Sequence, residues 1–382
     1  MRVWLAIALA AAALFLSVWI YLPAPTYFLL NFSVGAPEVC QWIALTALVA
    51  MLLAGPSARE SGGARVALTF GGVAFALAIS PFARLASTER RFAASMQGRS
   101  VEPARPMRAS PLSVVDLFRG IASGDAKVTR GVVFAEPSGV RLAMDIYQPP
   151  TRGTFPVIVQ IYGGAWQRGE PGDRANFASL LASRGWVVFA IDYRHAPAFQ
   201  WPAALDDVHA ALAWIREHAI QYDADTTRMV LMGRSAGAHL AMLAAYKEPR
   251  AAVRGVVSYY GPADLPDAYF HPPRPDPLDI RDVDVKFIGG SPEQKPREYA
   301  DASPVSYADR AQPPTLLIQG ARDNIVEARY ARALRERLAA GGTNVAYLEI
   351  PWAGHAFDAV FNGTSSQLAL YHTERFLTWA AR

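Results

Sequence analysis

A serine flanked by glycines lies between an apolar run and a helical pattern in the C-terminal half of the chain. Met229–Met232 leads into Gly233-Arg-Ser235-Ala-Gly237, and an alanine-rich apolar segment follows. This is the G-x-S-x-G pattern in the strand–helix context that it requires. So sharp a turn leaves no room for side chains beside the serine, and the helix start offers backbone N–H groups and a positive dipole end. The pattern predicts that Ser235 is a nucleophile, with a simple serine N-cap as the alternative.

Such a serine needs a general base to take its proton and a carboxylate to orient that base. Two later loops offer these groups, because Asp323 follows the apolar run Thr315–Gln319 and His355 follows Val345–Ile350. In a parallel sheet, the carboxyl ends of the strands meet at one edge, where reactive groups gather. We therefore expect His355 to act as general base and then general acid, with Asp323 fixing its tautomer. Asp264, which also follows a predicted strand, is the alternative acid.

The choice of His355 rests on its position. It alone among the histidines follows a late strand with a glycine, Gly354, beside it. His239, one turn along the helix that follows the serine, is predicted to be a packing residue. The remaining histidines are His195, His209, His218, His271 and His372.

Paired glycines after another apolar run predict an oxyanion hole. Val157–Tyr162 is followed directly by Gly163, Gly164 and Ala165, where the backbone can approach a developing negative charge unobstructed. The amides of Gly164 and Ala165, or of Gly163 and Gly164, would join that of Ala236. Loss of one such donor typically costs ~10²–10³ in turnover. A tight turn without a catalytic role is the alternative.

The elements that must position these groups alternate along the C-terminal part of the chain. A hairpin around residues 132–147 followed by strand–helix units predicts a mostly parallel sheet with helices on both faces, an α/β fold. The further predicted strands are Val157–Tyr162, Val187–Asp192, Met229–Gly233, Gly255–Tyr260, Thr315–Gln319 and Val345–Ile350. The predicted helices are Asn176–Arg184, Ala203–His218, Ala236–Ala245, Glu327–Ala340 and Gln367–Ala380. Residues 262–314, with eleven prolines, interrupt this rhythm and are predicted to form a lid or cap; a surface excursion is the alternative.

The N-terminal part has a different composition. Three uncharged apolar runs, Val3–Leu22, Val39–Ala54 and Val66–Ala83, predict a transmembrane region over residues 1–83 with about three helices. One or two spans and a cleaved signal peptide are the alternatives. Residues 84–119 are predicted to form a basic amphipathic segment and a proline-rich linker, lying either on anionic headgroups or in solvent. The three apolar runs predict a multi-pass membrane location. Because arginines flank the spans on both sides, the positive-inside rule does not assign the C-terminal domain to either side of the membrane.

Composition and charge exclude other classes. With 52% apolar and 18% charged residues, the 382-residue chain is too apolar to be disordered. Its single cysteine, Cys40, excludes an internal disulfide and a thiolate metal cluster. The net charge of +4 arises in the first 119 residues, and the rest is nearly neutral, which argues against a nucleic-acid partner.

Taken together, several motifs resemble those of the α/β-hydrolase esterases. They are Gly163-Gly-Ala-Trp166, Asp192-Tyr-Arg-His-Ala-Pro197, the serine pentapeptide, Asp323 and Gly354-His355, in the chain order Ser, Asp, His of that fold. More narrowly, they are similar to the branch with an HGGxW-type loop, which includes carboxylesterases, feruloyl-esterase-like proteins, kynurenine formamidases and membrane-anchored isoprenylcysteine methylesterases. The resemblance covers residues 131–382 and implies an α/β-hydrolase domain over residues 120–382. Tyr162 stands where the family usually has histidine, which puts the rigidity of the oxyanion loop in question.

The sequence thus predicts a membrane-anchored serine esterase that forms an acyl-enzyme on Ser235, with no metal and no organic cofactor. A small or lipid-like ester is the expected substrate, and membrane lipid is the expected partner of the N-terminal helices. An amidase or peptidase with the same triad is the nearest alternative. A non-catalytic binding protein on a hydrolase fold is the alternative from another class.

Overall fold

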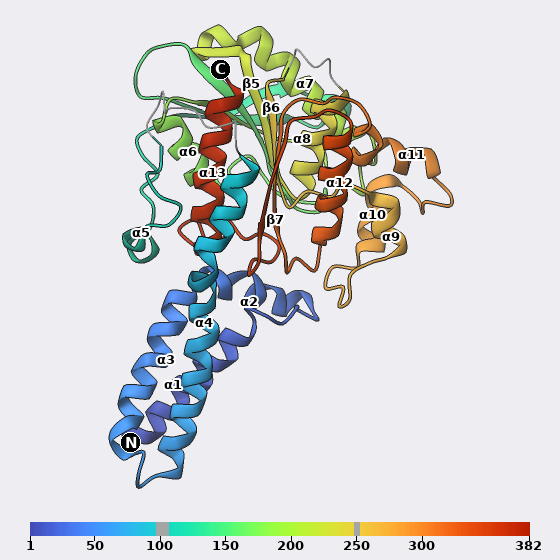
Figure 1. Cartoon of the computed structure of the whole chain (residues 1–382). Helices are drawn as coiled ribbons and strands as arrows, with labels where there is room; N and C mark the ends of the chain where they lie inside the picture. The colour runs from blue at the N-terminus through green and yellow to red at the C-terminus, as the bar shows by residue number, and fades with distance from the viewer. Residues whose placement is uncertain (97–106, 248–252) are drawn as a thin grey trace.

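The computed structural model describes residues 1–96, 107–247 and 253–382, and its C-terminal part is built around one twisted sheet of eight strands (Figure 1). The order across the sheet is β1-β2-β4-β3-β5-β6-β7-β8. β1 pairs antiparallel with β2, and β2 with β4, whereas all later neighbours are parallel. The prediction of a hairpin leading into a mostly parallel sheet is confirmed. The strands are β1 Lys127–Ala135, β2 Leu142–Gln148, β3 Phe155–Ile161, β4 Val187–Ile191, β5 Ala224–Arg234, β6 Gly255–Tyr259, β7 Thr315–Gly320 and β8 Val345–Ile350.

Helices cover both faces of this sheet because the central strands are apolar on both faces. Along β3, Val157 and Val159 pack into the core on one face, and Ile158 packs into the core on the other. The first core includes α7 (Ala203–His218), α8 (Ala236–Lys247) and α12 (Ala328–Ala340); the second includes α6 (Ala175–Ser183) and α13 (Thr364–Ala380). All five helices lie within three residues of their predicted ends. Short 3₁₀ helices occur at Gly55–Ser57, Pro137–Gly139, Ala219–Tyr222 and Pro304–Tyr307.

The proline-rich stretch at residues 262–314 folds into short helices beside the edge of the sheet where the parallel strands end. These are α9 (Leu265–Phe270), α10 (Ile280–Ile288) and α11 (Pro296–Asp301). Proline stands in the first turn of α9 and of α11, where its missing N–H costs nothing. Proline therefore starts a helix at these two positions, whereas the prolines at 272, 273, 275 and 277 lie in the connection between α9 and α10.

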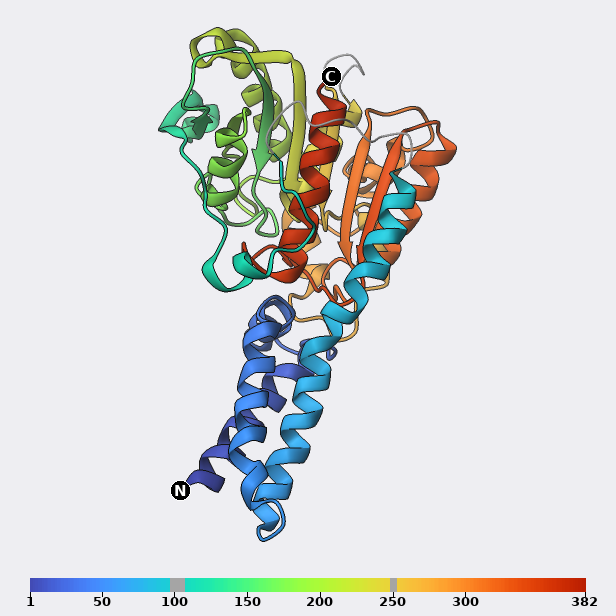
Figure 2. The ribbon, with the colours of Figure 1, turned by 60° about the vertical axis from the view of Figure 1, so that its left-hand side comes forward.

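The N-terminal part forms four α-helices, α1 (Arg2–Val18), α2 (Tyr27–Glu38), α3 (Cys40–Ala54) and α4 (Gly62–Ser95). They precede the hydrolase part, which comprises the described residues from 107 to 382. α1, α3 and α4 pack together as a helical bundle that extends away from the sheet (Figures 1 and 2). α2 lies across the junction between this bundle and the hydrolase part. Two of these helical segments, Cys40–Ser57 and Gly62–Ser95, are long and apolar enough to cross a membrane, and α1 is apolar but shorter. A short helix, α5 (Val114–Arg119), follows the bundle in the chain.

The predicted domain boundary after residue 83 falls inside α4. Pro81 does not end this helix, because the hydroxyl of Ser80 donates to Leu77 O at 2.6 Å, the carbonyl that an N–H at position 81 would otherwise bond. Beyond the boundary, Phe92 is buried in the hydrolase core and Glu89 hydrogen-bonds His372 of α13. Residues 84–95 are thus a continuation of α4 that packs on the hydrolase part (Figure 2), neither a separate surface helix nor a solvated linker. The rest of the predicted linker lies partly outside the described residues.

Candidate active site

The serine loop is a sharp elbow between β5 and α8. Ser235 has a φ of 51°, a left-handed backbone conformation that residues other than glycine adopt at a cost in free energy. A Cβ on Gly233 would lie 2.2 Å from Gly237 O, and one on Gly237 would lie 2.2 Å from Tyr162 O. Both contacts are impossible, so glycine is required at both positions. The elbow raises the Ser235 side chain into a pocket at the end of the sheet.

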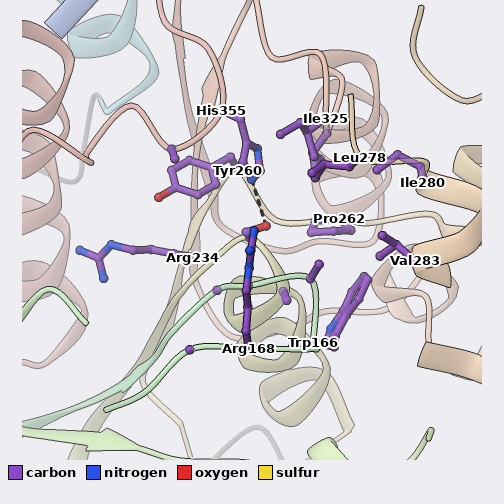
Figure 3. Close-up of a pocket in the computed structure, with 18 of the residues that line it drawn as sticks. Trp166, Arg168, Arg234, Tyr260, Pro262, Leu278, Ile280, Val283, Ile325 and His355 are labelled. Carbon is purple, nitrogen blue, oxygen red and sulfur yellow. Dashed lines mark hydrogen bonds between the residues drawn. The ribbon is translucent and has the colours of Figure 1, made fainter. Parts of the chain in front are cut away.

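Three side chains from distant loops form a hydrogen-bonded chain in this pocket. Ser235 Oγ lies 3.0 Å from Nε2 of His355, and His355 Nδ1 lies 2.8 Å from Oδ2 of Asp323 (Figure 3 shows the first of these contacts). With Nδ1–H donating to the carboxylate, Nε2 is free to accept the serine proton. The geometry can therefore deprotonate the serine as it attacks an electrophile.

The carboxylate of Asp323 is fixed by its own loop. Its Oδ1 accepts from the backbone N–H groups of Ile325 and Val326, both at 2.9 Å, and its Oδ2 accepts from Gln319 Nε2 at 2.9 Å. The alternative acid, Asp264, instead caps α9 by accepting from Asp267 N at 3.1 Å. The structure thus brings Asp323, and not Asp264, to the histidine.

His239 lies one helical turn from the serine, as predicted, and is fully buried. Its Nδ1 accepts from Trp166 Nε1 at 3.2 Å, and its Nε2 lies 2.6 Å from Ala302 O. Burial lowers the pKa of His239 to about 4, so the ring is neutral. Its contacts are those of a packing residue that supports the loop of Trp166.

The glycine loop after β3 curls back toward the elbow. A Cβ on Gly163 would lie 2.7 Å from Arg234 O, and one on Gly164, whose φ is 129°, would lie 2.0 Å from Arg168 O. Within the described part of the chain, the N–H groups of Gly164, Ala165 and Ala236 donate to no protein acceptor. All three residues line the same pocket as Ser235. Their backbone N–H groups are therefore available to an oxyanion.

Tyr162, at the start of this loop, is held by hydrogen bonds and by ring stacking. Its hydroxyl donates to Oδ1 of Asp192 and lies 2.8 Å from His195 Nε2, and its ring stacks on Tyr193 at 4.5 Å between centroids. Arg194, in the same motif, pairs with Asp207 at 2.8 Å. The Asp192–Pro197 segment thus shapes the loop, and tyrosine in place of histidine is held by three neighbouring residues.

The pocket around Ser235 has a volume of about 400 Å³ and two chemically different sides. In Figure 3, Pro262, Leu278, Ile280, Val283 and Ile325 form an apolar side, and Tyr260 and Arg234 lie on the other side of His355. The described residues contain no group of three or more His, Cys, Asp or Glu side chains placed to hold a metal.

Two groups of residues at this pocket were not identified from the sequence. Tyr27, Leu30 and Asn31 of α2 line it, although they are more than 200 residues from the serine. The second is Asp358, which does not itself line the pocket but forms a buried ion pair with the pocket residue Arg234, the variable residue of the serine motif. In the sequence, residues 23–38 between two apolar runs are notable only for containing no Lys or Arg, and nothing in the sequence linked them to the site.

One buried carboxyl also belongs to this pocket. Asp284 of α10 is 2% exposed, lines the pocket and has an Oδ2 atom without a hydrogen-bond partner. Burial, and secondarily the charge of Asp276, raises the pKa of Asp284 well above its usual range. The side chain is therefore a neutral acid at pH values where an exposed aspartate is charged.

This neutral acid predicts a pH dependence of stability. The folded state keeps a proton that the unfolded state loses above pH ~4, so Asp284 makes the free energy of unfolding fall as pH rises toward its folded pKa, by at most ~1.4 kcal/mol per pH unit. Asp284→Asn removes this loss. We therefore expect the melting temperature of Asp284→Asn minus that of the unmodified protein to increase as the pH is raised from 5 to 8. Asp282→Asn, on the exposed face of the same helix, is the control and should show no such trend. A constant difference for Asp284→Asn across this range would contradict the assignment.

Comparison with known proteins shows that the chain is similar to esterases. The BD-FAE family model matches residues 144–338, about half of the chain. Probable carboxylic ester hydrolase LipM of Mycobacterium tuberculosis (strain ATCC 25618 / H37Rv) is 31% identical over 286 residues, covering 70% of this chain and 63% of that protein. Probable isoprenylcysteine alpha-carbonyl methylesterase ICMEL1 of Oryza sativa subsp. japonica is 38% identical over 117 residues, covering 30% of this chain and 27% of that protein. The chain thus spans less than two thirds of either curated relative.

The fold is also similar to that of solved structures. The propionate-bound structure of esterase Est2 from Thermogutta terrifontis superposes with a TM-score of 0.54 at 24% identity. The match covers 67% of this chain and 94% of that one. At this identity the likeness supports the fold alone.

Proposed function

This chain belongs to the BD-FAE family of α/β-hydrolase esterases, and from this premise we propose that it hydrolyses carboxylic esters through an acyl-enzyme on Ser235 while its N-terminal helices hold it in a membrane. The observation that carries the proposal is the unbroken chain of hydrogen bonds from Ser235 through His355 to Asp323, in a pocket with room for a small ester. No metal or organic cofactor enters the proposed reaction.

The proposed reaction has two halves. Ser235 Oγ attacks the ester carbonyl as His355 Nε2 takes its proton, and the tetrahedral oxyanion is stabilised by backbone N–H groups of Gly164, Ala165 and Ala236. His355 then gives that proton to the leaving alcohol, and the acyl group remains on the serine. A water molecule then attacks the acyl carbonyl as His355 takes its proton, and His355 returns that proton to Ser235 Oγ as the carboxylic acid leaves. Asp323 stabilises the imidazolium that forms in each half.

The membrane part of the proposal is supported by how the N-terminal helices pack. The inner faces of α1, α3 and α4 are alanine-rich, with Ala10, Ala47 and Ala67 fully buried, while large apolar side chains such as Trp4 and Leu52 point outward. Only 39% of the residues of Cys40–Ser57, and 28% of the most apolar 18-residue stretch of Gly62–Ser95, are buried within the protein. Small residues inside and large apolar residues outside suit helices that are surrounded by lipid.

Activity and membrane association are tested on the full-length protein. A fluorophosphonate probe should label Ser235, and 4-nitrophenyl butyrate should be hydrolysed at least ~10²-fold faster than the matched anilide. Faster anilide cleavage would favour an amidase, and failure to label or to turn over either substrate would favour a binding protein. The protein should stay in the membrane fraction through alkaline carbonate washing and leave it in detergent; release by carbonate alone would exclude membrane spans.

A further inference from the structure

The junction helix α2 forms one wall of the active-site pocket. Tyr27, Leu30 and Asn31 line the pocket that holds Ser235. Arg168, in the loop after β3, donates to the Tyr27 hydroxyl at 2.6 Å and lies over its ring. Leu30 packs on the apolar side of the pocket, against a cluster formed by Ile280, Ile325 and Val326. The N-terminal part of the chain therefore completes the substrate site.

The segment before α2 is bound to the loop that carries the acid of the triad. Arg322 Nη1 donates to Tyr21 O at 2.7 Å, and its guanidinium lies 4.5 Å from the centre of the Tyr21 ring. Asn324 Nδ2 donates to Ala24 O at 3.1 Å. Arg322 and Asn324 flank Asp323, so the junction is attached on both sides of this residue.

The far end of α2 is bound to the helix after the histidine loop. Glu38 is fully buried, and its Oε2 accepts from Ser365 N at 2.9 Å in the first turn of α13. A Cβ on Gly363 would lie 2.5 Å from the same oxygen, so the two segments are in close contact. Both ends of α2 are thus fixed relative to the catalytic loops.

Exposed apolar residues lie on α2 and on the side of the hydrolase part that faces the helical bundle. On α2, Phe28 is 71% exposed, and Tyr27 beside it is half exposed. Phe270 at the end of α9 is also exposed, as are Val114, Val115 and Phe118 of α5. α2, α5 and α9 all lie toward the bundle in Figure 1. Aromatic side chains gather at the membrane–water interface, and exposed apolar patches mark such contact surfaces.

We infer that the substrate is the ester of a membrane-resident amphiphile, whose apolar chain passes from the bilayer across α2 into the apolar side of the pocket and contacts Leu30. This inference rests on the proposed esterase function and names its substrate class. The bundle sets the pocket at the membrane surface, the exposed rings of α2 meet the lipid, and Leu30 together with Ile325 continues the apolar path to Ser235. A soluble, short-chain ester would use only the inner part of this path.

A first experiment measures chain-length preference in detergent. Leu30→Trp fills the outer part of the apolar path, and we expect it to lower the ratio of kcat/KM for 4-nitrophenyl decanoate to that for the acetate at least ~10-fold. Leu29→Trp places the same ring on the neighbouring residue, which does not line the pocket, and should leave the ratio unchanged. An unchanged ratio for Leu30→Trp would overturn the assignment of Leu30 to the substrate path.

A second experiment separates membrane-borne from soluble substrate. The full-length protein is reconstituted in phosphatidylcholine vesicles that contain a palmitoyl ester of a fluorogenic alcohol, and turnover of this ester is compared with that of dissolved 4-nitrophenyl acetate. Phe28→Glu puts a charge on the lipid-facing side of α2 and should lower the embedded-to-soluble ratio at least ~5-fold. Ile220→Glu, at an equally apolar position that is 91% exposed beyond α7, should not change it.

The outcomes distinguish this inference from the proposed function. Hydrolysis of the acetate with no measurable hydrolysis of the embedded ester would overturn the inference and leave the esterase function standing. Equal ratios for Phe28→Glu and Ile220→Glu would also overturn it. Absence of turnover of either ester, with no fluorophosphonate labelling, would remove the proposed function itself.

Discussion

Ser235→Ala is expected to lower ester turnover at least ~10³-fold, because the substitution removes the only atom of the proposed triad that forms a bond to the substrate. The residual rate would come from the N–H groups of Gly164, Ala165 and Ala236, which still stabilise an oxyanion when water attacks directly. The measurement is kcat for 4-nitrophenyl butyrate with detergent-solubilised protein, together with loss of fluorophosphonate labelling.

Ser258 provides a matched control for this prediction. It is a buried serine on β6, next to β5 in the sheet, and it does not line the pocket. Ser258→Ala should leave kcat within about threefold and keep the labelling. Retention of activity within tenfold by Ser235→Ala would rule out the assigned nucleophile.

Asp323→Asn is expected to have the second largest effect, a loss of ~10³–10⁴ in kcat. Asp323 Oδ2 accepts from both His355 Nδ1 and Gln319 Nε2, and Oδ1 accepts from two backbone N–H groups. An amide cannot accept at every one of these positions, so its NH₂ group faces a donor whichever way it is placed. If that NH₂ faces His355, Nδ1 must become the acceptor, and Nε2 then carries the proton and cannot take that of Ser235.

Asp264→Asn is the control for this second prediction, because Asp264 is also an aspartate that lines the pocket. An asparagine still accepts from Asp267 N and still caps α9, so kcat should fall less than ~10-fold. Circular dichroism and thermal unfolding of both variants would show that the fold is kept. A larger loss from Asp264→Asn than from Asp323→Asn would exchange the roles of the two residues.

The elements of the hydrolase part were predictable because each carries its signal locally. Continuous apolar runs such as Val187–Ile191 are typical of strands buried on both faces, and the pattern of Ala203–His218 repeats with the period of a helix. The serine elbow also carries a local sequence signal, because a Cβ on Gly233 would clash with Gly237 only four residues away. The constraint on Gly237 comes from Tyr162, which follows the neighbouring strand β3. The positions of Ser235, Asp323 and His355 followed from one further rule, that parallel strands end at one edge.

Predictions failed or were absent where the deciding contact joins distant parts of the chain. The end of the apolar run at Ala83 predicted a separate segment from residue 84, but α4 continues to Ser95, where Phe92 packs in the hydrolase core and Glu89 contacts His372. No local pattern indicates such packing, because it depends on where α13 lies after folding. Whether α1, α3 and α4 cross a bilayer remains a prediction.

By itself, the sequence determined the order of strands and helices, the serine elbow and the identity of the three polar groups proposed for catalysis. Only the tertiary structure decided which aspartate hydrogen-bonds His355, that Arg234 pairs with Asp358, and that α2 forms part of the pocket wall. The physical reason is range. Hydrophobic periodicity and turn sterics act between near neighbours in the chain, whereas hydrogen bonds and pocket walls join residues that packing brings together from hundreds of positions apart.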